Sequence, residues 1–109
     1  MRVSIDDIGG VIAKQDDRYI VKDNTTLKNL ILSSTFLEAN KSTSGHKHEG
    51  QEEVYFFVTG EGRMLLDDDE FEVKAGDVVL IPDGAFHRVY NDSGEPFYFV
   101  CVFDGGRNH

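Results

Sequence analysis

Two histidines, His46 and His48, are separated by a single residue near the middle of the chain. In an extended segment, residues at positions i and i+2 point to the same side. Glu53 follows after a glycine-containing break, and His87 lies 39 residues beyond His48. Imidazole and carboxylate groups are ligands for divalent transition metals, so these four side chains are candidates for one metal site. The remaining histidine, His109, is the last residue.

The length and composition of the chain indicate one packed domain. Its 109 residues are 39% hydrophobic and include eight Phe and four Tyr, which is enough for a single core. Cys101 is the one cysteine, so no disulfide can form within the chain, and this suits a reducing compartment. The first residues lack the basic-then-apolar order of a secretory signal, and no apolar run approaches the ~20 residues that would span a bilayer. We therefore expect a cytoplasmic protein.

The charge of the chain argues against polyanionic partners. Twenty acidic and 11 basic residues give a formal net charge of −9. A field of this sign repels phosphate backbones and anionic lipids, so we expect neither nucleic-acid nor membrane binding. A small anionic ligand stays possible, because a bound divalent cation can dominate the local field.

Short apolar runs between turn residues predict a series of β-strands. The strands are expected at residues 19–21, within 27–37, and at 54–59, 63–66, 71–74, 78–81, 86–90 and 97–103. Asp23 and Asn24 are expected to form the turn that ends the first of these. Residues 1–17 predict only a weak strand or an arm.

This pattern predicts an all-β fold in one domain that spans residues 1–109. No long helix, linker or repeat is evident, and a sandwich or barrel leaves fewer unpaired strand edges than an open sheet. Three adjacent aspartates, Asp67 to Asp69, lack the glycine and the later glutamate of a calcium-binding loop. We expect them to form a solvated hairpin tip.

Two spaced motifs within residues 40–91 resemble those of the cupin superfamily of small jelly-roll β-barrels. The first has the form G-x5-H-x-H-x3-4-E-x6-G, which is matched by His46, His48, Glu53 and Gly60. The second has the form G-x5-P-x-G-x2-H-x3-N, which is matched by Gly76, Pro82, Gly84, His87 and Asn91. Asn40 stands where the first motif has its leading glycine. Asn is among the residues that best tolerate a positive φ, so the backbone requirement can still be met.

The resemblance implies one divalent transition metal, held by His46, His48, Glu53 and His87. Three imidazoles and a carboxylate suit Mn, Fe, Co, Ni, Cu or Zn and leave one or two coordination positions open, as a reactive site requires. Two other interpretations stay open. The four residues could be ordinary polar residues of the barrel, or the chain could have kept the ligands without using a metal.

Side chains around these residues have less specific roles. Tyr55 lies two residues after Glu53, so strand alternation points it to the same interior, where its hydroxyl could donate a proton or orient a substrate. A core tyrosine with a satisfied hydroxyl is the favoured interpretation. Alternation points Glu52, Arg88 and Tyr90 outward, whereas it leaves the direction of Arg63 open. Cys101 is expected to be an inert buried thiol, while Gly76, Pro82 and Gly84 shape the chain around the strand at 78–81.

The cupin resemblance leaves the reaction open, because this fold carries many unrelated chemistries. We favour a metal-dependent enzyme that acts on a small polar metabolite, with isomerisation or epimerisation of a sugar or sugar phosphate as the preferred reaction. No residue is an evident catalytic base. The alternatives are a non-haem iron dioxygenase and a non-catalytic ligand-binding or sensor cupin. We also expect a homodimer, because the strands at 27–37 and 97–103 offer more apolar surface than one small barrel needs.

Overall fold

The computed structural model describes residues 1–105, which form nine β-strands and no helix. The strands are β1 (Val11–Gln15), β2 (Tyr19–Asn24), β3 (Leu30–Leu37), β4 (Glu53–Thr59), β5 (Glu61–Leu66), β6 (Asp69–Lys74), β7 (Val78–Ile81), β8 (His87–Tyr90) and β9 (Phe97–Asp104). This confirms the all-β prediction. In this part of the chain no helix has the length and apolarity that a membrane crossing requires. The cytoplasmic location stays a prediction.

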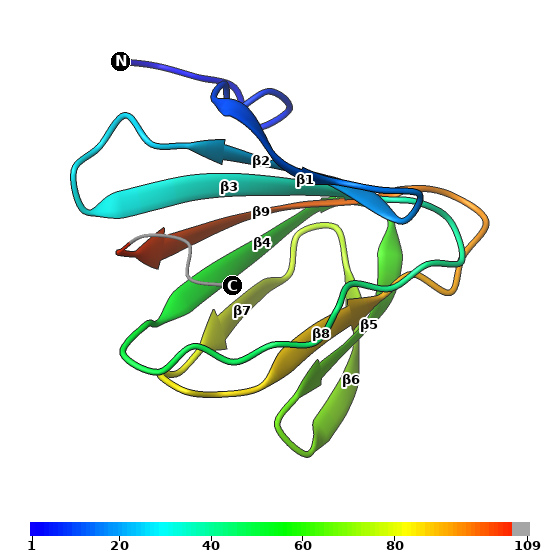
Figure 1. Ribbon diagram of the computed structural model, residues 1–109. Helices are drawn as coiled ribbons and strands as arrows, with labels where there is room; N and C mark the ends of the chain where they lie inside the picture. Colours follow the sequence, from blue (N-terminus) through cyan, green and yellow to red (C-terminus); the bar gives the residue numbers. More distant parts are fainter. Residues whose placement is uncertain (106–109) are drawn as a thin grey trace.

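The strands form two antiparallel sheets (Figure 1). The larger has the order β1-β2-β3-β9-β4-β7, and the smaller has the order β6-β5-β8. The first and last parts of the chain meet in the larger sheet, where β3 pairs along its full length with β9, from Leu30 opposite Asp104 to Leu37 opposite Phe97. This crossing of distant strands is the jelly-roll arrangement that the motifs implied.

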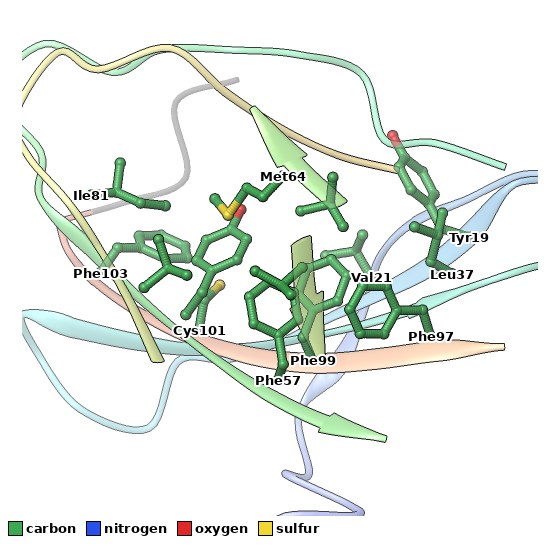
Figure 2. Packing of buried hydrophobic residues seen from close by; sticks show 14 of the residues in the cluster. Tyr19, Val21, Leu37, Phe57, Met64, Ile81, Phe97, Phe99, Cys101 and Phe103 are labelled. Atoms are coloured by element: carbon green, nitrogen blue, oxygen red, sulfur yellow. The ribbon is translucent and has the colours of Figure 1, made fainter. Parts of the chain in front are cut away.

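The hydrophobic core lies between the two sheets and is rich in aromatic rings (Figure 2). Phe57 of β4 stacks on Phe97 of β9, with ring centroids 5.1 Å apart, and contacts Phe99 at 5.3 Å. Met64 of β5 joins this core from the smaller sheet and has no exposed surface. Each buried ring contributes roughly 1.5–3 kcal/mol by leaving water, so this core holds the two sheets together.

The structure corrects the prediction at the end of β2. Asp23 and Asn24 are buried strand residues, not a turn, and they pair with Ser33 and Leu32. The Asn24 amide nitrogen donates a 2.7 Å hydrogen bond to the carbonyl of Ile8 in the N-terminal segment, while its carbonyl oxygen accepts from the amide and hydroxyl of Thr26. Local turn preference is therefore overridden by a contact with a segment 16 residues away.

Two predictions about the loops are confirmed. Asn40 has a φ of 59°, the left-handed conformation that the missing motif glycine required. The Asp67-to-Asp69 stretch makes the turn between β5 and β6, and Asp68 and Asp69 are exposed. This is the solvated tip expected from the sequence.

Candidate metal centre

The segment between β3 and β4 carries the two neighbouring histidines along the edge of the smaller sheet. It is extended, as the spacing of the histidines suggested, but it forms no regular strand and is joined to β8 by isolated bridges. The amide of His46 donates to the carbonyl of His87 at 3.2 Å, and the amide of His87 donates back at 3.0 Å. The first motif is therefore fixed directly against the second.

A glycine allows this close approach. A Cβ atom at Gly45 would collide with the ring of Phe86, the residue before His87. The amide of Gly84 also donates a 3.0 Å hydrogen bond to the carbonyl of His48, so the second of the two neighbouring histidines is fixed as well. These backbone contacts set the height at which the imidazoles enter the interior.

Four side chains converge from three places in the fold. His46 and His48 come from the connecting segment, Glu53 is the first residue of β4, and His87 is the first residue of β8. The potential ligand nitrogens of the three histidines all lie within 4.8 Å of one another. Glu53 places one carboxylate oxygen 3.7 Å from Nε2 of His48 and the other 3.8 Å from Nε2 of His87. The sequence thus identified four residues that the fold brings together.

The environment of His87 favours the neutral imidazole. The side chain is only 2% exposed, and its Nδ1 lies 3.2 Å from the carbonyl of Ala85, which makes Nδ1 the protonated nitrogen. Its Nε2 is buried and has no hydrogen-bond partner within residues 1–105. Burial lowers the pKa of His87 below its usual 6.5, and the neighbouring His48 lowers it further, while the Ala85 hydrogen bond opposes the shift.

Stability of the metal-free protein should therefore fall as the pH drops below about 6.5, the value for histidine in an unfolded chain. In that range the unfolded chain binds a proton at His87 that the folded protein excludes. We expect the free energy of unfolding, measured with urea at pH 7.5 and 5.5, to decrease more for the native sequence than for His87→Gln. An equal decrease in both proteins would contradict this assignment.

A cavity of about 30 Å³ adjoins the converging side chains. Its lining residues are Lys14, Tyr19, Val21, Ser33, Thr35, Thr43, His46, Glu53, Tyr55, Phe99, Cys101 and Phe103. Tyr55 faces inward as predicted, stacks on Phe99, and presents its ring edge-on to His87 at a centroid distance of 5.7 Å. The volume is enough for about two water molecules.

Several predicted outward or ambiguous residues lie away from this cavity. Glu52 is exposed. Arg88 donates to the carbonyl of Thr43 and the hydroxyl of Ser42, so it braces the connecting segment from outside. Arg63 forms ion pairs with Asp92 and Glu70, which settles the direction that the sequence left open.

The sequence reasoning missed the polar wall of the cavity, which includes Lys14, Ser33 and Thr35. Ser33 and Thr35 belong to a run of three polar residues, 33–35, in an otherwise apolar strand, and this run is a signal that could have revealed them. No such signal marks Lys14. His109, the fourth histidine, lies outside the described residues.

Comparison with known proteins identifies the family to which this fold belongs. Residues 35–103, which include both motifs, match the family described as "Cupin domain". The chain belongs to the cupin family. An uncharacterized protein of Methanocaldococcus jannaschii is 32% identical over 76% of this chain and 75% of its own length. A conserved protein with a double-stranded β-helix domain from Klebsiella pneumoniae has the same fold, with a TM-score of 0.82 at 19% identity over 99% of this chain and 92% of that one.

Other cupin relatives carry functional names. A glucose-6-phosphate isomerase of Thermococcus gammatolerans is 35% identical over 62% of this chain. An oxalate-binding protein of Thermotoga maritima is 33% identical over 61% of this chain. This cupin spans 39% of the isomerase and 54% of the oxalate-binding protein.

Proposed function

We propose that this cupin is a metal-dependent enzyme that acts on a small polar metabolite. His46, His48, Glu53 and His87 would hold one divalent ion of the first transition row. Three imidazoles and one carboxylate suit Mn, Fe, Co, Ni, Cu or Zn. The ion would supply Lewis-acid polarisation of a substrate carbonyl oxygen at an open coordination position.

The observation that carries this proposal is the arrangement around Nε2 of His87. This buried nitrogen lacks a hydrogen-bond partner within the described chain, and its ring is oriented by the Nδ1 contact with Ala85. The carboxylate oxygens of Glu53 lie 3.7 and 3.8 Å from the two facing imidazoles, too far for hydrogen bonds. Ligands of one ion with bonds of ~2.1 Å can stand up to about 4.2 Å apart, so these separations suit a shared ion.

Isomerisation of a sugar or sugar phosphate is our preferred reaction. The relatives named glucose-6-phosphate isomerase support it, and Tyr55 supplies a phenolic hydroxyl within the same cavity. That hydroxyl could donate a proton or a hydrogen bond to the substrate oxygen that gains charge. The cavity is small, so only the reacting end of a sugar would enter it.

A second candidate is binding of a small dicarboxylate without turnover. The relative named oxalate-binding protein and the small cavity favour it. The two candidates share the metal site and differ in whether the bound molecule is changed.

Product analysis distinguishes them. Protein loaded separately with each candidate metal would be incubated with aldoses, their phosphates and oxalate, and followed by NMR. Interconversion of an aldose and a ketose that metal removal abolishes, and that Tyr55→Phe slows, supports the isomerase. Oxalate binding without any conversion favours the second candidate, whereas oxygen consumption with iron would favour a dioxygenase and contradict both.

A homodimer is the expected assembly, and of the two segments proposed from sequence only residues 27–37 present exposed apolar side chains. Most of β9 is buried. Exposed apolar side chains lie on β3, on β4 and on both edge strands of the larger sheet, with Val11 of β1 71% exposed and Leu80 of β7 69% exposed. Edge strands with exposed apolar residues tend to be covered by a partner. Light scattering at micromolar concentration should give twice the chain mass of 12.2 kDa, and Leu80→Glu should lower it. A monomeric native protein would rule this assembly out.

A further inference from the structure

One wall of the cavity is built from β1, β2 and β3 and is polar. Lys14 of β1 pairs with Val21 of β2, which in turn pairs with Thr35 of β3. Directly paired residues share a face of the sheet, and Val21 and Thr35 are buried on the inner face. Lys14 therefore lies on the inner face and is only half-buried there.

A lysine on the inner face of a barrel is unusual, since this residue is mostly exposed in folded proteins. Among the described residues that line the cavity, Lys14 is the one lysine or arginine and Glu53 is the one acid. Lys14 also lies outside residues 35–103, which match the cupin family, and outside both histidine motifs. It is therefore a feature of this chain that the family match does not account for.

The charge of the cavity follows from these residues. On the proposed ligand set, a divalent ion with three neutral imidazoles and one carboxylate keeps a net positive charge. The ammonium of Lys14 adds a second positive charge, while the protein as a whole carries −9. Such a local field concentrates small anions.

We propose that Lys14 anchors an anionic oxygen group of the ligand, a carboxylate or a phosphate, within the metal-bearing cavity. Ser33, Thr35 and Thr43 line the same cavity, where the Ser33 hydroxyl donates to the carbonyl of Lys22 and the Thr43 hydroxyl accepts from the amide of Val89. A charge-assisted contact with the ammonium would hold one end of a short ligand while its other end faces the open position of the metal. This inference rests on the proposed metal site and adds the charge class of its ligand.

Anion binding to the cobalt-loaded, full-length protein tests the inference. Cobalt stoichiometry and visible absorption would be measured first, followed by calorimetric titration with oxalate, inorganic phosphate and the neutral oxamide. The variants are Lys14→Met, which keeps a long unbranched side chain without the charge, and Lys14→Arg, which keeps the charge. Lys22→Met is the matched control, since it removes one charge from the outer face of neighbouring β2, where Lys22 pairs with Asp7.

We expect Lys14→Met to bind cobalt normally and to weaken binding of oxalate or phosphate about ten- to a hundredfold. Lys14→Arg and Lys22→Met should stay within about threefold of the native protein, and oxamide should bind weakly to all. The anion that loses more affinity identifies the group recognised. Normal cobalt binding with equal anion affinity in all four proteins overturns the role of Lys14 alone. Failure of the native protein to bind cobalt overturns the proposed metal site and this inference together.

Discussion

Replacement of His87 with alanine should remove the metal from the protein while the fold persists. His87 would supply one of four ligands, and its loss should reduce affinity by more than the roughly 10–100-fold that loss of a supporting residue costs. Native protein purified without added metal should carry close to one equivalent, measured by elemental mass spectrometry. The far-ultraviolet circular dichroism of the variant should stay that of a β-protein, because the core lies elsewhere, around Phe57, Phe97 and Phe99.

Parallel variants show whether the two motifs form one site. His46→Ala and His48→Ala should lose metal to a similar degree, while His109→Ala, a histidine outside both motifs, should retain it. Full occupancy in His87→Ala combined with loss in His46→Ala would refute the four-residue site.

Replacement of Asn91 with aspartate should be among the most destabilising changes available. The Asn91 side chain is 1% exposed and directly follows β8. Its amide nitrogen lies 3.3, 3.1 and 2.7 Å from the carbonyls of Leu37, Glu38 and Glu95, so it ties the end of β3 to the start of β9. Aspartate has the same shape but presents an oxygen to those three acceptors.

We expect Asn91→Asp to lower the free energy of unfolding by about 3–5 kcal/mol, because several buried carbonyls lose their donor. The melting temperature should fall by more than about 12 °C. Asn29→Asp makes the same chemical change at an exposed position and should stay within about 0.5 kcal/mol of the native protein. Similar melting temperatures for the two variants would show that the Asn91 contacts contribute little.

Much of the fold and the candidate site followed from local patterns. The strand that became β4 shows aromatic and β-branched residues between turns, and alternation alone placed Tyr55 beside Glu53. Asn40 was interpretable because a positive φ restricts residue choice so strongly. These inferences depend on neighbours in sequence, and the chain is regular where they apply.

Lys14 was beyond the reach of the same reasoning. The pairing of β1 with β2 shifts register between Ile12 and Lys14, and such an irregularity breaks the alternation from which a side chain's direction is inferred. Asn91 was visible as a motif position, but its three acceptors come from residues that lie near it only after folding. The turn prediction at Asp23 and Asn24 was wrong for the same reason, since the Asn24 amide is bonded to Ile8, which lies near it only after folding.

The isolated bridges that join the connecting segment to β8 bear on how a metal would exchange. His46 and His48 belong to this segment, whereas Glu53 and His87 stand at the ends of regular strands. A segment fixed by a few hydrogen bonds can open locally at a fraction of the free energy of global unfolding. On the proposed ligand set, one such opening would detach half of the ligands while the barrel stays intact. The dissociation rate of the ion would then report the opening of residues 38–52, and the lifetime of the loaded protein would be independent of how stable its core is.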